Sequence, residues 1–206
     1  MVAIIDYGVG NLFSLRSSFA AIGEEAEVTS DPEVIRRADR VILPGVGAFG
    51  DAAEKLRQTG LDWVVREEAG RGKPLMGICL GMQLLFERSF EYGEHEGLGL
   101  LKGEIRPIAE RIPENLKIPQ MGWNALKIVR QSPLLKYTQD GEYVYFVHSY
   151  SAVKCEESLL ASTEYGAELT ACVGLGNVYG CQFHPEKSGA VGLKMLKAFC
   201  ETGAEV

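Results

Sequence analysis

One cysteine of the chain stands where a nucleophile could be held. Residues 72–86 read GKPLMGICLGMQLLF, with Cys79 between Gly77 and Gly81 where an apolar run passes into a helical pattern. This spacing is typical of a sharp strand-to-helix turn, in which glycines avoid the collisions that side chains would cause. A thiol at a helix N-terminus favours thiolate, and the N–H of Leu80 would point where an oxyanion forms. The alternative is a buried cysteine that packs at a tight turn.

A base and an orienting carboxylate follow late in the chain. His184 lies in GCQFHPEKS at the predicted end of a strand, and Pro185 favours an extended backbone at His184. Because residues i and i+2 of a strand share a face, Glu186 is expected beside the imidazole. The three residues would supply the nucleophile, the base and the acid of thiol acyl transfer. A solvated His-Pro-Glu at a strand end is the alternative, and the cysteine turn makes it the poorer explanation.

The other two histidines are predicted to serve elsewhere. His95 lies in EYGEHEGLG, which is typical of a solvated acidic loop. His148 lies in the apolar run VYFVHSY, which favours a core position or a supporting role. The four remaining cysteines have no turn like that at Cys79, so core positions are predicted for Cys155, Cys172, Cys181 and Cys200.

A second oxyanion donor is predicted in the glycine-rich turn LPGVGAFGD, residues 43–51. It follows a predicted strand, and neighbouring strand ends of a parallel sheet share one crevice. The N–H groups of Gly45 and Val46 could therefore face the oxyanion. The same glycines could cradle a phosphate, but the chain has no P-loop lysine pattern, and we rank phosphate binding lower.

Positioning these residues requires a scaffold, and the first half of the chain predicts a parallel sheet. Short apolar runs predict strands, and apolar residues at helical spacing predict helices. The predicted strands are 2–7, 26–30, 40–45 and 73–79. The predicted helices are 11–23, about 48–58 and 61–70. This alternation indicates right-handed crossovers and a sheet covered on both faces.

The second half predicts short antiparallel strands or hairpins and a last helix over about 189–202. The strand segments are 101–109, 124–131, 143–153, 159–166, 168–176 and 177–186. No repeat, low-complexity tract or linker divides the sequence. We expect one α/β domain over 1–206, with a mostly parallel central sheet, helices on both faces and antiparallel strands added in the second half.

Composition narrows the class of protein. The 206 residues are 46% hydrophobic, and a net charge of -7 argues against nucleic-acid binding by the chain alone. No apolar run approaches the ~20 residues that span a bilayer, and the start lacks the features of a secretory signal. Five cysteines without a CxxC pair and without clustered histidines suggest neither a disulfide framework nor a zinc site. A reduced cytoplasmic protein that needs no metal or cofactor is expected.

The motifs GICLGMQLL and FHPEKS together resemble the class I glutamine amidotransferases. In that family, which has a flavodoxin-like sheet, a Cys-His-Glu triad hydrolyses glutamine to glutamate and ammonia. The segments IDYGVGNLFS, LPGVGAF and IPQMGWN, with YFVHSYSA, resemble in particular the glutaminase subunits of imidazole glycerol phosphate synthases of histidine biosynthesis. The similarity runs from about residue 4 to the last helix, and its most particular motif is MGWN, residues 121–124.

The resemblance implies a catalytic triad of Cys79, His184 and Glu186 and further site residues. L-Glutamine would be held by Gln83, by Glu91 and by backbone around Gly47, Ser149 and Tyr150. Trp123 would anchor a cyclase subunit, a (β/α)8 barrel that receives the ammonia in a heterodimer. Interface positions would be Gln120, Met121, Asn124 and Lys187; many relatives carry histidine where Gln120 stands. MGWN is interpreted as a loop, which favours a projecting indole over a core tryptophan.

Three alternatives stay open. The chain could be the glutaminase subunit of another amidotransferase, although MGWN counts against that. It could be a cysteine hydrolase or a chaperone-like protein with a similar turn, which the late His-Pro-Glu disfavours. It could also be a non-catalytic binding subunit of the same fold, which would be expected to lose Cys79 or His184. We expect a slow isolated enzyme whose partner completes the oxyanion hole through a peptide flip in 45–47.

Overall fold

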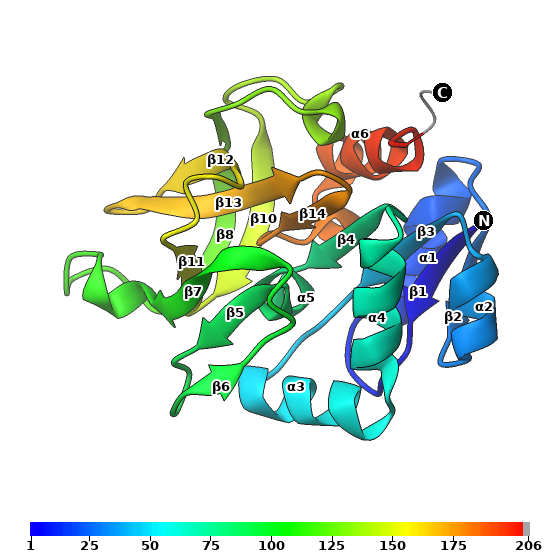
Figure 1. Ribbon diagram of the computed structural model, residues 1–206. Helices are drawn as coiled ribbons and strands as arrows, with labels where there is room; N and C mark the ends of the chain where they lie inside the picture. The colour runs from blue at the N-terminus through cyan, green and yellow to red at the C-terminus, as the bar shows by residue number, and fades with distance from the viewer. Residues whose placement is uncertain (204–206) are drawn as a thin grey trace.

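The computed structural model describes residues 1–203, so the last three residues of the domain predicted over 1–206 lie outside it. An eight-stranded sheet forms its centre, in the strand order β2-β1-β3-β4-β14-β13-β12-β9 (Figure 1). Five neighbouring strands are parallel: β1 (Val2–Ile5), β2 (Ala26–Thr29), β3 (Arg40–Leu43), β4 (Leu75–Ile78) and β14 (Val178–Cys181). The antiparallel extension consists of β13 (Glu168–Leu175), β12 (Leu159–Glu164) and β9 (Lys127–Ile128).

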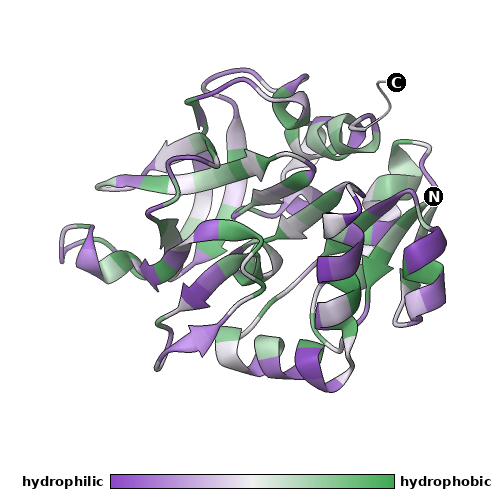
Figure 2. Ribbon diagram, in the orientation of Figure 1, coloured by the Kyte–Doolittle hydropathy of each residue, from purple (hydrophilic) through white to green (hydrophobic). Residues whose placement is uncertain are grey.

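Helices cover both faces of the parallel strands. On one face lie α1 (Leu12–Ala21) and α6 (Gly189–Cys200); on the other lie α2 (Pro32–Arg37), α3 (Phe49–Gln58) and α4 (Leu61–Gly70). Alternate residues of β1 enter different cores: Ile5 joins the core under α3 and α4, and Ile4 joins the core under α1 and α6. Strands β1, β4 and β14 are therefore buried along their whole length, whereas the outer helices carry hydrophilic stretches (Figure 2).

Two smaller sheets complete the fold. In one, β8 (Gln120–Ala125) pairs with β10 (Tyr143–His148), placing Gln120 opposite His148 and Trp123 opposite Tyr145. The other has the order β11-β7-β5-β6, formed by β11 (Tyr150–Val153), β7 (Leu101–Pro107), β5 (Phe86–Ser89) and β6 (His95–Glu96). The short helices are α5 (Leu80–Leu84), η1 (Ile108–Glu110), η2 (Pro133–Leu135) and η3 (Pro185–Lys187). The predicted fold class is confirmed.

Several local predictions differ from the structure. The MGWN segment lies in strand β8 and not in a loop. His95 lies in strand β6, half-buried, and its ring packs against Gly50 instead of standing in a solvated loop. Helix α2 was not predicted, although Asp31 accepts a hydrogen bond from the backbone N–H of Glu33 and so caps it, the usual start signal.

The predicted chemistry gathers at one edge of the large sheet. Cys79 follows β4, Gly45 follows β3, and His184 comes three residues after β14. Because these strands are parallel neighbours, their carboxyl ends open into one crevice.

Candidate active site

Cys79 occupies a strained turn between β4 and α5. Its backbone has φ 54° and ψ -111°, a conformation that L-residues rarely adopt and that marks functional sites. A Cβ on Gly77 would lie 2.5 Å from the carbonyl oxygen of Gly81, and one on Gly81 would lie 1.8 Å from that of Leu43. Both glycines are thus required, as the spacing predicted. Helix α5 has only five residues, so its dipole is smaller than that of a full-length helix.

His184 and Glu186 are paired, but not along a strand. Strand β14 ends at Cys181, and Glu186 lies in the turn η3 that follows His184. The His184 Nδ1 stands 2.8 Å from Glu186 Oε1, and both side chains are almost completely buried. His184 keeps the extended backbone predicted from Pro185. The contact was therefore foreseen, and its geometry comes from a tight turn.

The electrostatics place a proton on His184. Burial by itself lowers the pKa of His184, but hydrogen bonds to Cys79 and Glu186 and the charges of both outweigh it and raise that pKa to about 9. At neutral pH the imidazole is therefore protonated, with the Cys79 sulfur and the Glu186 side chain as its hydrogen-bond partners. Such a pair is suited to nucleophilic attack followed by proton donation to the leaving group.

The residues predicted to supply oxyanion donors lie next to Cys79. Leu80 is the first residue of α5, where the backbone N–H has no partner within the helix. Val46 and Gly47 line the cavity that also contains Cys79, and Gly47 has φ 94°. Gly45 is buried behind them, where a Cβ would lie 2.9 Å from the backbone nitrogen of Gly81. The 45–47 turn and the cysteine turn are thus packed backbone to backbone.

A cavity of about 540 Å³ opens over Cys79. Nine predicted site residues line it: Val46, Gly47, Cys79, Leu80, Gln83, Glu91, Ser149, Tyr150 and His184. Gln83 Nε2 donates to the carbonyl of Tyr150 at 3.2 Å and to Gln182 Oε1 at 3.0 Å. Glu91 accepts a 2.6 Å hydrogen bond from the N–H of Phe49, and burial raises the pKa of its carboxyl group.

Sequence reasoning missed several residues that line this cavity, among them Tyr92, Ile118 and Pro119. Tyr92 is exposed, has φ 54° and meets the ring of Tyr150 edge-on. Ile118 and Pro119 immediately precede β8. All three lie outside regular elements, so no periodicity marks them; the X-Pro dipeptide is their one local signal.

His148 lines the cavity and forms a buried hydrogen bond with Gln120. Burial lowers the pKa of His148 to about 4, so its ring is neutral. Nδ1 lies 2.7 Å from the carbonyl of Tyr150 and must donate to it. Nε2, 2.8 Å from the Gln120 amide, is then an acceptor, so that amide must turn its NH₂ toward the ring. This orientation also gives the buried nitrogen of Gln120 the partner it otherwise lacks among the described residues. His148 has the predicted supporting position.

The predicted interface residues divide into exposed and buried ones. Met121 and Trp123 are 63% and 53% exposed on the same face of β8. Trp123 meets the Tyr145 ring edge-on, and Lys187 lies over that ring. Asn124 is half-buried and donates to the carbonyl of Glu164. Gln120 is fully buried, so its side chain faces His148 and not this surface.

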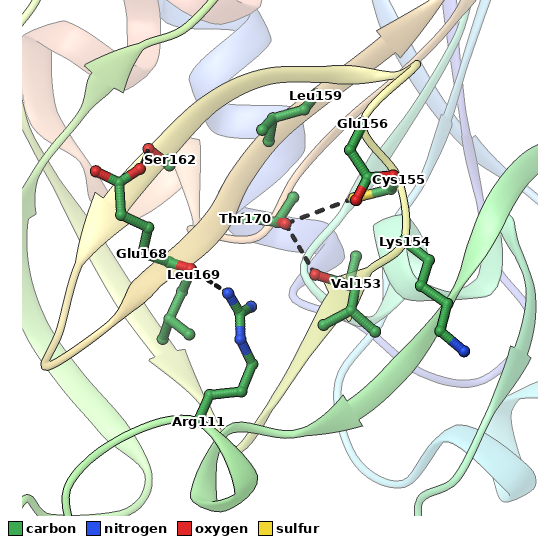
Figure 3. Close-up of a pocket in the computed structure, with 11 residues that line it drawn as sticks. Arg111, Val153, Lys154, Cys155, Glu156, Leu159, Ser162, Glu168, Leu169 and Thr170 are labelled. Atoms are coloured by element: carbon green, nitrogen blue, oxygen red, sulfur yellow. Dashed lines mark hydrogen bonds between the residues drawn. The ribbon is translucent and has the colours of Figure 1, made fainter.

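A second cavity, of about 340 Å³, lies beside β11, β12 and β13 (Figure 3). Its thiol, Cys155, is buried and hydrogen-bonded to Thr170, and burial raises the pKa of this cysteine. Arg111 donates to the carbonyl of Glu168 across the mouth. None of its described lining residues is a histidine. It therefore offers Cys155 no imidazole base like that beside Cys79.

Within residues 1–203 no cluster of three potential metal-ligating side chains occurs. The helices of this described part are also too short and too polar to cross a bilayer.

Comparison with known proteins agrees with this geometry. A family model described as "Glutamine amidotransferase class-I" matches residues 3–202. The chain belongs to this family. As a class I glutamine amidotransferase it is an enzyme, so the non-catalytic alternative is not supported.

Curated relatives of this amidotransferase confirm the narrower resemblance. The protein named "Imidazole glycerol phosphate synthase subunit HisH" from Wolinella succinogenes is 52% identical over 98% of this chain and 100% of its own length. Its namesake from Bacillus subtilis is 50% identical over 100% of this chain and 98% of its own length. Two solved structures share the fold at low identity. A glutamine amidotransferase has a TM-score of 0.76 with 20% identity, covering 98% of each chain. PurLQS from Thermotoga maritima has 0.75 with 22%, covering 97% of this chain and 96% of its own.

The pairing of His184 with Glu186 predicts a pH dependence for this amidotransferase. The pKa of His184 is raised to about 9, so the imidazolium persists through neutral pH and is lost as the pH rises through about 9. Ammonia release should fall there, because the departing amine loses its proton donor. In Glu186→Gln the pKa of His184 falls, and the alkaline decline should begin at lower pH, with kcat about 10²-fold lower.

The measurement is kcat against pH for the wild type and for Glu186→Gln. Glu201→Gln is the control, because Glu201 pairs with Lys136 at the surface. An alkaline limb that stays in place in Glu186→Gln would contradict the assigned role of Glu186.

Proposed function

We propose that this glutamine amidotransferase hydrolyses L-glutamine at Cys79 and delivers the ammonia to a (β/α)8-barrel cyclase subunit in a heterodimer. That partner would form imidazole glycerol phosphate and aminoimidazole carboxamide ribotide in histidine biosynthesis, as the cytoplasmic synthase does in the resembled group. One catalytic domain, without metal or cofactor, carries out the glutaminase step. The single observation that carries the proposal is the Cys79–His184–Glu186 array, which stands over a cavity bordered by the segment that leads into strand β8.

The first half of the reaction makes a thioester. The Cys79 thiolate attacks the side-chain amide carbon of glutamine, forming a C–S bond while the carbonyl oxygen takes the negative charge. The N–H of Leu80 and an N–H of the 45–47 turn hold that oxyanion, and losing one such donor costs about 10²–10³ in rate. His184 gives its proton to the nitrogen as the C–N bond breaks, so neutral ammonia leaves.

The second half regenerates the thiol. His184, now neutral, takes a proton from a water molecule that attacks the thioester carbon. The C–S bond breaks, and glutamate leaves with the oxygen of that water. Glu186 holds the Nδ1–H of His184 throughout, so Nε2 faces the reacting atoms.

The same cavity supplies groups for the α-carbon end of glutamine. Glu91 is the one carboxylate among its described lining residues, and an α-ammonium group would neutralise that buried charge. Backbone around Gly47, Ser149 and Tyr150 lines the same cavity. Gln83 holds the backbone of Tyr150 in place in this cavity by donating a hydrogen bond to its carbonyl group.

The partner would bind at Met121, Trp123 and Lys187, with Gln120 and Asn124 on the same strand as the anchor. Exposed aromatic side chains of this kind are typical interface anchors. Val46 and Gly47 are exposed, and the glycines that flank Val46 permit a change of backbone conformation. A docked partner could therefore reorient this turn and complete the oxyanion hole. The isolated chain would then be slow and would not waste glutamine.

The test is ammonia release by the purified chain, alone and with its cognate cyclase subunit plus that subunit's nucleotide substrate. We expect stimulation of about 10²-fold or more, the value of one oxyanion donor. Trp123→Ala should reduce the stimulation. Trp63→Ala is the matched control, because Trp63 is also exposed but lies on α4 and is not among the residues that line the cavity. Full activity without the partner, or equal effects of the two variants, would contradict the proposal.

A further inference from the structure

We propose that Tyr7 is a positioning residue that sets the oxyanion turn. Tyr7 lies just after β1 and is only 4% exposed, and its hydroxyl donates a 2.8 Å hydrogen bond to the carbonyl of Pro44. Pro44 directly precedes the 45–47 turn. The inference rests on the proposed mechanism, in which that turn supplies a donor to the oxyanion. It adds that the turn is anchored by a residue that follows the neighbouring strand β1.

The hydrogen bond fixes a whole peptide plane. The peptide between Pro44 and Gly45 is planar and trans, so its C=O and N–H point in opposite directions. While Tyr7 holds the carbonyl, the N–H of Gly45 is directed away from the tyrosine and cannot rotate. Breaking the bond would leave a buried carbonyl without its partner, which is costly.

Gly45 itself has no space in which to move. A Cβ there would lie 2.9 Å from the Tyr7 hydroxyl oxygen, 2.9 Å from the nitrogen of Gly81 and 3.0 Å from Cβ of Leu80. The residue is thus clamped between the tyrosine and the cysteine turn. Pro44 is held on a further side, because a Cβ on Gly10 would lie 3.1 Å from the proline ring.

The backbone is less tightly packed from Val46 onward, one residue after Gly45. Val46 and Gly47 are exposed, Gly47 has φ 94°, and no atom outside its immediate chain neighbours lies within 4 Å of the place where a Gly47 Cβ would stand. Any reorientation of the turn is therefore confined to the peptides after Gly45. Tyr7 fixes the position of Gly45, about which the following peptides would turn, relative to the N–H of Leu80. It thereby determines where an N–H of the reoriented turn would come to lie.

The hydroxyl remains a donor under all working conditions. Burial, with the nearby charge of Cys79, raises the pKa of Tyr7 well above its ordinary value. Tyr7 therefore stays protonated and is not a general base. Its effect must pass through the Pro44 carbonyl that it holds.

Tyr7→Phe tests this, because it removes the hydroxyl and keeps the ring. Ammonia release is measured with and without the cognate cyclase subunit, and Cys79 alkylation by iodoacetamide is measured in parallel. We expect kcat to fall about 10-fold, less than the 10²–10³ for loss of a whole donor, with KM changed by less than about 2-fold. The alkylation rate should not change, because alkylation of a thiolate forms no oxyanion.

The control is Tyr179→Phe, which removes a tyrosine hydroxyl from β14 at a cavity lined by different residues. An unchanged kcat in Tyr7→Phe would overturn the inference. A parallel fall of kcat and alkylation would also overturn it, since Tyr7 would then act on the thiol or on the fold. If the wild type shows no Cys79-dependent ammonia release, the proposed function fails instead, which separates the two conclusions.

Discussion

Replacing Cys79 by alanine should abolish ammonia release from glutamine, with a fall in kcat of about 10⁴-fold or more. Without the thiol no thioester can form, and the remaining oxyanion donors and His184 can act only on direct attack by water. Alanine differs from cysteine only by loss of the sulfur atom, so the fold should persist. Ammonia release is measured with saturating glutamine, alongside thermal unfolding of the variant.

The matched control is Cys155→Ala. Cys155 is equally buried, lies in the second cavity and has no histidine among the described residues around it (Figure 3). Its loss should leave kcat within about 2-fold of the wild type. If Cys79→Ala retained more than about 1% of the activity, a nucleophile other than this thiol would be required.

Gly81→Ala should destabilise the protein by about 3 kcal/mol or more. The added Cβ would lie 1.8 Å from the carbonyl oxygen of Leu43, so either the end of β3 or the cysteine turn must move. Both lead into the proposed oxyanion donors, so kcat should fall in the same variant. Two quantities are measured for the variant and the wild type: the free energy of unfolding in urea, and the kcat of the fraction that remains folded.

Gly70→Ala provides the opposite case. Gly70 is the last residue of α4, and no heavy atom beyond its own helix and chain neighbours lies within 4 Å of the place where a Gly70 Cβ would stand. Alanine there should stabilise the helix by up to about 1 kcal/mol, because glycine loses more chain entropy on folding. Two Gly→Ala substitutions of opposite sign would show that close backbone approach, and not glycine content, determines stability here. A change within about 1 kcal/mol for Gly81→Ala would contradict the tight packing of the two turns.

The parallel half of the fold could be predicted because its signals are local. Each buried strand is a short apolar run, and each helix carries its own periodicity, so the alternation is visible in order along the chain. The antiparallel half depends on pairing between distant segments. Nothing local shows that β14 lies beside β4, or that the run at 143–153 breaks at Ser149 into strands of two different sheets.

The residues of the candidate site also differ in how far local sequence could predict their positions. Cys79 could be identified because the turn around it requires glycine at positions 77 and 81, and this spacing is visible in the sequence. Glu186 was placed beside His184 through strand geometry, whereas the contact comes from the turn at Pro185. Gln120 was assigned with its neighbours to the interface, and only the pairing of β8 with β10 shows that its side chain points inward to His148. Tyr92 remained hidden because a residue at positive φ in a loop leaves no periodic mark.

The register of β8 couples the proposed partner surface to the cavity that we propose binds glutamine. Gln120 meets His148 and Trp123 meets Tyr145 along one continuous ladder. Since side chains alternate strictly between the two faces, insertion or deletion of a single residue here would turn Trp123 inward and Gln120 outward together. If the chain acts as proposed, specificity for another ammonia acceptor should arise by substitution on the outer face and not by insertion or deletion of a single residue in β8.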